Sequence, residues 1–210
     1  MADLNCISLA GDGKVAASDA TWNTVHDATT GTAADSDTSE YCIAGDNSGT
    51  YVIHRMFMPI DTSTLPAGAS ISAASLFIKS GPTVSGSGIT IGLVQTDQAS
   101  TATLADADFN NCGAVDSPTE GATRVNVTTA DTWYELVLNA TGISWIVNDE
   151  VNATKLGIRG SNDLDDTAPA AYYYANFHML ENATEANRPY LAITYTIGGA
   201  TNTSNFFSVL

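Results

Sequence analysis

Basic residues are scarce in this chain. Seven of its 210 residues are lysine or arginine, against 23 aspartates and glutamates, so the formal net charge is −16. The seven are scattered from Lys14 to Arg188 and form no cluster that could neutralise phosphate groups. We therefore expect no binding to nucleic acid and no attraction to an anionic membrane surface.

The sequence also lacks the patterns that indicate membrane spans, secretory leaders and zinc ribbons. No apolar run reaches the roughly 18 residues that a membrane span needs. The first residues have neither the basic nor the apolar region of a secretory leader. The cysteines, Cys6, Cys42 and Cys112, include no C-x-x-C pair, which argues against a zinc ribbon. A bond between Cys6 and Cys42 is left open by the sequence.

Catalytic signatures are missing as well. Neither a G-x-S-x-G elbow nor an H-E-x-x-H motif occurs, and the histidines, His26, His54 and His178, are far apart in the chain. The pair Gly86 and Gly88 precedes an expected strand rather than a helix, so it does not predict a phosphate cradle. We expect that the chain is not an enzyme.

What the chain has is a series of short alternating apolar runs separated by Gly, Asn, Asp, Ser and Pro clusters. With 44% hydrophobic and only 14% charged residues, this pattern predicts one all-β domain, a sandwich or barrel, over residues 1–197. The strand expected at Tyr51–Asp61 has apolar residues on both faces, since Ile53 and Phe57 lie opposite Met58. We expect this strand to be partly buried on both sides.

The same alternation predicts further strands at residues 3–9, 71–79, 89–96, 132–138, 155–160, 171–177 and 190–197. Residues 19–50 are rich in Thr, Asp, Ser and Gly, and we expect a loop-rich region there. It contains short strand-like pieces at Thr21–His26 and Tyr41–Ala44. One short helix is predicted at Ala140–Val147, where Asn139 or Thr141 could cap the first turn.

Several pieces of this pattern resemble, in order, the DNRLRE-domain family. A strand with Arg55 ends in Asp61 and is followed by a turn with Pro66 and Gly68 and by the alternating run Ile71–Ile78. The later pieces are the strand with Trp133, the helix with Trp145 followed by Leu156-Gly157-Ile158, and the segment Arg188-Pro189-Tyr190-Leu191. The resemblance covers roughly residues 20–197.

This resemblance implies a jelly-roll-like antiparallel β-sandwich. Domains of the family look like carbohydrate-binding modules of secreted and cell-surface proteins, and similar ones occur in phage structural proteins. This chain departs from the secreted members because it is a lone domain, with no attached enzyme and no secretory leader. The departure favours a virion protein.

Aromatic side chains are the candidate sugar-binding residues. Trp22, Trp133 and the run Tyr172-Tyr173-Tyr174 could stack on sugar rings. Alternation along a strand points Tyr173 to the face opposite its two neighbours, so at least one of the three is expected to be accessible. The alternative is that these rings pack in the core or cover an edge strand.

Two acidic loops are the candidate calcium sites. They hold Asp35 and Asp37 in one loop and Asp163, Asp165 and Asp166 in the other. Carboxylates on alternate loop residues can converge on one hard cation such as calcium, which takes several oxygen ligands. The alternative is that these aspartates only form turns, as loop aspartates often do. No other cofactor is expected.

The last residues combine a polar linker with an apolar end. Residues 198–205 have the composition of a flexible linker and lead to Phe206, Phe207, Val209 and Leu210. This arm, residues 198–210, could fold back as an edge strand of its own domain. We expect instead that its apolar residues contact a neighbouring subunit by strand addition.

Together these features predict a virion structural protein, a capsid-decorating or capsid-surface subunit that stabilises the particle and takes part in attachment to the host. Its expected partners are copies of itself or other virion proteins, with cell-surface glycans as a further ligand. The alternatives are a carbohydrate-binding or adhesin module of an extracellular protein, and an extracellular filament subunit. The expected location is the virion surface or, for the alternatives, the extracellular space.

Overall fold

The computed structural model describes residues 1–35 and 37–197. Over these residues the chain forms strands β1 to β12 and a few short helices, and every strand pair is antiparallel. The predicted all-β sandwich is confirmed. Within the described ranges no helix has the length and apolar character needed to cross a membrane.

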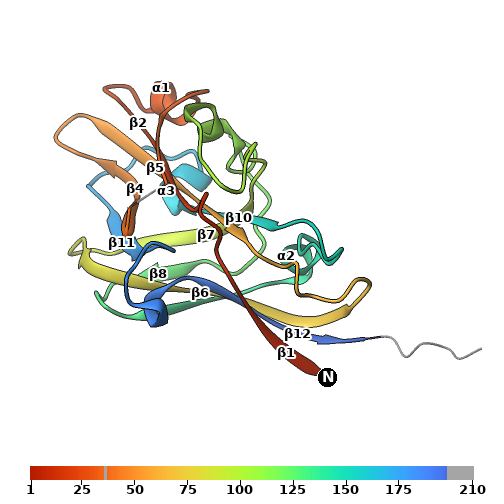
Figure 1. The fold of residues 1–210 in the computed structure, drawn as a ribbon. Helices are drawn as coiled ribbons and strands as arrows, with labels where there is room; N and C mark the ends of the chain where they lie inside the picture. Colours follow the sequence, from red (N-terminus) through yellow and green to blue (C-terminus); the bar gives the residue numbers. More distant parts are fainter. Residues whose placement is uncertain (36, 198–210) are drawn as a thin grey trace, which may run out of the picture.

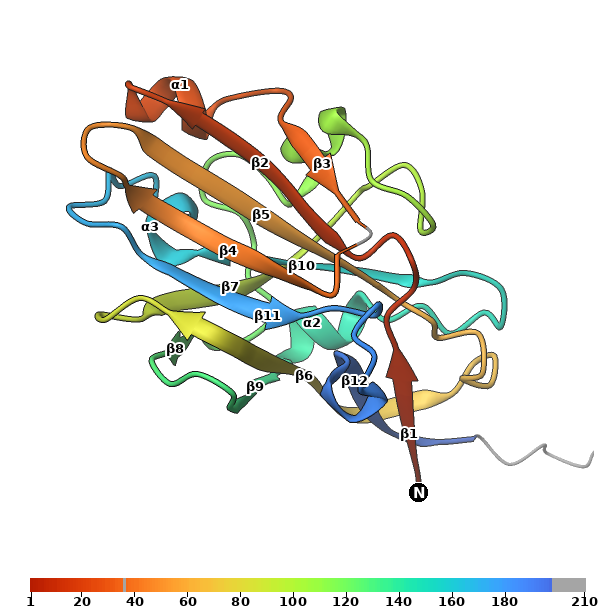
Figure 2. The same cartoon turned by 60° about the vertical axis from the view of Figure 1, so that its left-hand side comes forward.

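The first sheet, which we call sheet A, has the order β1-β12-β6-β9. Its strands are β1 (Ala2–Ile7), β12 (Tyr190–Thr196), the first part of β6 (Ser70–Val84) and β9 (Trp133–Val137). The long β6 then passes into the second sheet, where Ser80 and Val84 pair with β11. One continuous strand therefore connects the two layers of the sandwich (Figures 1 and 2).

The second sheet, sheet B, is built around β5 (Tyr51–Ile60). One edge of β5 pairs with β2 (Gly13–Asp19), and the other edge pairs with β4 over its first half and with β10 over its second half. The sheet therefore divides at the middle of β5. The remaining strands are β3 (Thr32–Ala34), β4 (Ser39–Asp46), β7 (Ile89–Gln95), β8 (Val125–Val127), β10 (Thr154–Gly160) and β11 (Tyr174–His178).

Inward-facing side chains of the two sheets form the main core. Met56, Met58 and Ile60 of β5 are fully buried in one cluster with Leu76 and Ile78 of β6. Their two-residue spacing is the alternation of a strand with one face toward the interior. Burying a side chain of this size contributes about 1.5–3 kcal/mol, so this core is the principal source of stability.

A second core lies on the outward face of sheet B. Three short helices cover this face as an outer layer: α1 (Trp22–His26), the 3-10 helix η1 (Asp106–Asn111) and α3 (Ser161–Leu164). Under them, Val15 of β2 and Ile53 and Phe57 of β5 pack with Phe109 of η1. In Figure 1, α1 and β2 lie at the top of the molecule, and β1 and β12 lie at the bottom. The predicted burial of both faces of β5 is confirmed.

The structure corrects several expected elements. The strand-like piece at Thr21–His26 is wrong, because Trp22–His26 forms helix α1, whose buried Trp22 and Val25 pack on the second core. The predicted helix at Ala140–Val147 is shorter: α2 spans Ala140–Ser144, and Asn139 caps it by accepting from the Gly142 amide. Strand β2 and helix α3 were not predicted, and residues 19–50 hold α1, β3 and β4.

The three cysteines are all free thiols. Each is buried, so the pairing of Cys6 with Cys42 that the sequence left open does not occur in the structure. Cys6 and Cys42 contribute to the main core, and Cys112 contributes to the second core. Burial raises the pKa of the Cys112 thiol to about 12, so it is held as an uncharged apolar group.

Candidate functional site

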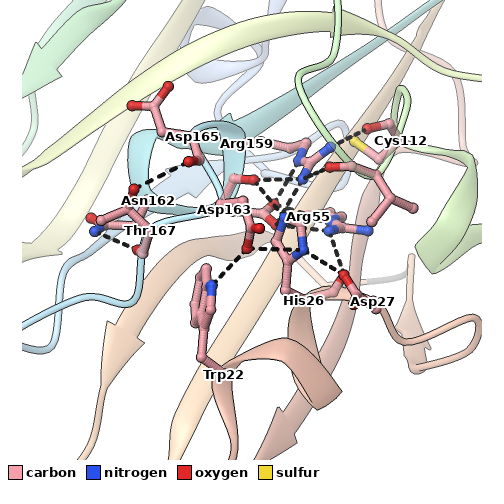
Figure 3. A network of polar contacts seen from close by, with 12 residues as sticks. Trp22, His26, Asp27, Arg55, Cys112, Arg159, Asn162, Asp163, Asp165 and Thr167 are labelled. Carbon is pink, nitrogen blue, oxygen red and sulfur yellow. Dashed lines mark hydrogen bonds and ion pairs between the residues drawn. The ribbon is translucent and has the colours of Figure 1, made fainter.

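Two arginines lie side by side beneath the outer layer. Arg55 of β5 and Arg159 of β10 are fully buried and lie one residue beyond the paired residues Met56 and Ile158. Like charges at neighbouring positions of paired strands destabilise a sheet unless something neutralises them. Here the neutralising group is Asp163, which α3 places above both side chains (Figure 3).

The carboxylate of Asp163 accepts hydrogen bonds from both guanidinium groups. Arg55 donates from Nη2 to Oδ1 at 2.7 Å and from Nε to Oδ2 at 3.0 Å, and Arg159 donates to the same oxygens at 2.8 and 2.6 Å. Burial opposes ionisation of Asp163, but the two arginines outweigh it and lower its pKa to about 2. The carboxylate therefore stays ionised over the whole physiological range.

The remaining donors of the two arginines bind the backbone of the outer layer. The accepting carbonyl groups belong to His26, Phe109, Cys112, Ala114 and Val115. Every one of these residues lies in a loop or short helix over sheet B rather than in the sheet. The network therefore attaches the outer layer to the strands. It offers no open position for a substrate, and we interpret it as structural.

The predicted calcium ligands lie apart in the structure. Besides Asp163, Asp165 forms a two-point ion pair with Arg124, with both N–O distances 2.6 Å, and Asp166 accepts a hydrogen bond from the Trp22 indole at 2.9 Å. In the other loop, Asp35 accepts from the Leu104 amide at 2.6 Å, whereas Asp37 lies beside Glu40 and Lys14. Neither loop gathers its carboxylates around a common point.

Three tyrosines surround an open cavity over β4, β5 and β11 of sheet B. Tyr41, Tyr172 and Tyr174 line a space of about 310 Å³ together with His54 and Ile43. The rings of Tyr41 and Tyr174 are 6.0 Å apart, and those of Tyr172 and Tyr174 are 5.1 Å apart. Such partly exposed rings can stack on an apolar or sugar ligand. Tyr41 was not among the predicted sugar-binding residues, and it reaches the cavity because β4 pairs with β11.

His54 forms the polar part of this cavity. Burial, and then the positive charge of Lys14, lower the pKa of His54 to about 3, so its ring is neutral. Its Nδ1 is buried and has no hydrogen-bond partner among the described residues. Tyr173 points away from the cavity and packs against the main core, as strand alternation predicted.

The two predicted tryptophans occupy different surroundings. Trp22 is only 7% exposed, and its ring packs under the outer layer against Tyr51 and His26. It is therefore not available for stacking on a sugar. Trp133 is 38% exposed and lies on the outward face of sheet A, edge-on to Tyr190 at 5.5 Å. The structure places Trp133 far in the fold from the tyrosine cavity.

The outward face of sheet A has an uncovered apolar surface. Phe77 of β6 stacks on Tyr190 of β12 at 4.9 Å, Ile7 of β1 is 50% exposed, and Val137 of β9 is 59% exposed. The strand registers align Ile7, Tyr190 and Phe77 across three strands. On β9, Val137 lies opposite Ser75 and Trp133 lies opposite Lys79, with Glu135 between them opposite Phe77. We call this surface the bare face and define it by five residues: Ile7, Phe77, Trp133, Val137 and Tyr190.

No protein-family model matches this chain, and no curated protein matches its sequence. The resemblance to the DNRLRE-domain family therefore stays a prediction. What the coordinates define is a class of molecule: an antiparallel β-sandwich with one outward face covered by its own helices and the other left bare.

Proposed function

We propose that this protein is a structural subunit of a particle surface, a virion protein of the capsid-decorating kind, which assembles through the bare face of sheet A. The observation that carries the proposal is the exposure of Ile7, Trp133 and Val137 beside the stacked rings of Phe77 and Tyr190. Several large apolar side chains exposed on one face are typical of a protein interface. Aromatic residues at its centre are typical of contacts that dominate binding energy.

The charge distribution supports the same surface as the interface. The chain carries a net charge of −16, so most of its surface repels another copy. The outward residues of sheet A carry little of that charge, namely Asp3 of β1, Lys79 of β6 and Glu135 of β9. The electrostatic repulsion that opposes contact with another copy, or with another virion protein, is therefore weakest at the bare face.

The arm at residues 198–210 lies outside the described residues, and we propose that it binds to a neighbouring copy of the chain. Strand β1 supports this choice, because among the described residues it forms a strand pair only with β12. Its other edge is bonded at its end, where the Ile7 carbonyl accepts from the Asp61 amide, and the stretch before that has no strand partner in the described part of the chain. An extended apolar segment can add to such an edge through backbone hydrogen bonds. The apolar side chains of the arm would then contact the adjoining bare face; they belong to Phe206, Phe207, Val209 and Leu210.

The arm is tested by the native mass of the full-length chain beside a version that ends at Gly199. We expect a defined oligomer of the full chain that the shorter version does not form, while circular dichroism shows both to be folded. Identical masses for the two versions would contradict a role for the arm. The location is tested separately with an antibody against the chain. Label on intact virus particles supports the proposal, and label confined to cell-surface filaments contradicts it.

A second function, sugar binding, is supported by the tyrosine cavity. Tyr41, Tyr172 and Tyr174 present rings around a neutral His54 whose Nδ1 lacks a partner among the described residues. A glycan array is the test, with Tyr172→Ala as the cavity variant and Trp133→Ala as the comparison on the bare face. Binding that Tyr172→Ala removes and Trp133→Ala retains supports the cavity. The absence of any bound glycan for the full-length chain contradicts it.

A further inference from the structure

His26 ends helix α1 and is fully buried, but one of its ring nitrogens points toward a group of carboxylates. Its Nε2 lies 3.1 Å from the Asp163 carbonyl oxygen. Its Nδ1 lies 2.7 Å from Oδ1 of Asp27 and 3.4 Å from Oδ1 of Asp166. Asp116, from the segment before β8, brings a third carboxylate to this point. Ligand atoms of His26, Asp116 and Asp166 all lie within 4.8 Å of one another.

The hydrogen bond at Nε2 decides what Nδ1 can do. A carbonyl oxygen only accepts, so Nε2 must carry the proton that it donates to Asp163. In the neutral ring, Nδ1 then has a lone pair, which faces the carboxylate of Asp27 (Figure 3). The carboxylate of Asp166 lies 3.4 Å from the same nitrogen. A lone pair and a carboxylate repel each other unless a cation or a second proton lies between them.

The charges in this region favour a cation of two positive charges. Arg55 and Arg159 supply two positive charges, whereas Asp163 and the three carboxylates near His26 supply four negative ones. The negative charges therefore exceed the positive ones by two among these groups, and a divalent ion would balance the excess.

We propose that His26 Nδ1, Asp116 and Asp166 bind a divalent transition-metal ion. One imidazole nitrogen with several carboxylates suits zinc or manganese rather than calcium, which prefers oxygen ligands alone. Groups behind the ligands hold them in place: the Asp163 carbonyl orients the imidazole, and the Trp22 indole donates to Asp166 at 2.9 Å. Such outer hydrogen bonds are typical of metal-binding histidines.

This site differs from the calcium site that the sequence predicted. Of the earlier ligands it keeps only Asp166, and it adds a histidine from α1 and an aspartate from the segment before β8. The ion would connect three separate parts of the outer layer: α1, the segment that contains Asp116, and the loop after α3. Its expected role is therefore to hold these parts of the outer layer together, beside the network of Asp163.

The test uses the full-length chain, freed of metal with a chelator and titrated with zinc chloride by isothermal calorimetry. We expect one zinc ion per chain and a higher melting temperature in its presence. Asp166→Asn is the main variant. Asp166 has a φ of 45°, a left-handed conformation that asparagine tolerates, and the amide oxygen can still accept from Trp22. Asp116→Asn is a second, exposed variant. Each should weaken zinc binding about tenfold or more.

Asp131→Asn is the matched control, because Asp131 is also exposed and also has a positive φ, of 52°, but lies far from the site. It should bind zinc as the unaltered chain does. The absence of saturable zinc binding would overturn the proposal. Zinc binding that Asp166→Asn and Asp116→Asn leave unchanged would also overturn it, as would binding of calcium in preference to zinc.

Discussion

The two outward faces of the sandwich differ, because the chain covers one of them with its own helices and leaves the other exposed. Sheet B carries two arginines on its outward face, and the chain covers them with α1, η1 and α3 and neutralises them with Asp163. Sheet A carries aromatic and aliphatic side chains on its outward face, and Ile7 and Val137 stay at least half exposed. The chain thus buries and neutralises the charged side chains of sheet B, and it leaves apolar side chains of sheet A exposed to solvent.

This difference indicates which face is stabilised by contacts within the chain and which face is available to a partner. A buried charge demands its counter-charge within the same chain, because an unpaired one costs several kcal/mol. An exposed apolar surface makes no such demand, and it gains free energy when another molecule covers it. On this account the covered face serves stability, and the bare face serves assembly.

The largest expected effect comes from breaking the network on the covered face. Asp163→Asn leaves Arg55 and Arg159 buried without a counter-charge, and we expect the free energy of unfolding to fall by about 3–5 kcal/mol. Urea unfolding followed by circular dichroism measures this change. The control is Asp165→Asn, two residues along the chain, whose pair with Arg124 is partly exposed and contributes less than about 1 kcal/mol. Equal losses for the two variants would contradict the account.

An intermediate effect is expected at Asp12, where the chain passes from β1 in sheet A to β2 in sheet B. Asp12 is fully buried, and its Oδ2 accepts from the Leu180 amide at 3.0 Å. Its Oδ1 has no partner among the described residues, and neither has Oε2 of the neighbouring Glu181. Burial, and to a lesser extent the charge of Glu181, raise the pKa of Asp12 from 3.8 to about 7.

This shift gives a pH dependence with a definite sign. Between about pH 4 and pH 7 the folded chain keeps a proton on Asp12 that the unfolded chain has released, so stability falls as the pH rises through this window. From about pH 5 to pH 8 the loss at this site is on the order of 2 kcal/mol. Asp12→Asn keeps the bond to Leu180 but cannot ionise. Urea unfolding at both pH values should show a smaller loss for the variant, and an unchanged loss would contradict the assignment.

The smallest expected effect comes from trimming the bare face. Val137→Ala removes a side chain that is 59% exposed, so the stability of the single chain should change by no more than about 0.5 kcal/mol. Val15→Ala is the matched variant on a strand of the covered face, where Val15 is fully buried in the second core. It should cost about 2 kcal/mol. Thermal unfolding of the two variants compares their losses of stability. Similar losses would show that Val137 is packed rather than exposed.

Much of the fold could be predicted from the sequence, because strand alternation is a local signal. The two-face burial of β5 followed directly from Ile53 and Phe57. Helix α1 could not be predicted in this way, because Trp22, Thr24 and Val25 favour strands and only packing on the second core makes them helical. Local preference is a weak guide where tertiary contacts decide.

The sites were less predictable because they depend on residues far apart in the chain. Arg55 and Asp163 are 108 positions apart, and Trp22 and Asp166 are 144 apart. Their contacts require the register of β5 with β10 and the position of α3, which no short motif specifies. Alternation along the run Tyr172–Tyr174 predicted that at least one of its rings is accessible, whereas Tyr41 joins the cavity only through the pairing of β4 with β11.

The most direct test of the bare face as the assembly surface is the native mass of two charge variants across a dilution series. Val137→Asp places a carboxylate on the bare face, and Val151→Asp places one at another exposed valine, in the segment before β10. The account predicts that the unaltered chain and Val151→Asp form the same oligomer and that Val137→Asp remains a single chain. An oligomer that persists in Val137→Asp, or a single chain in all three, would contradict it.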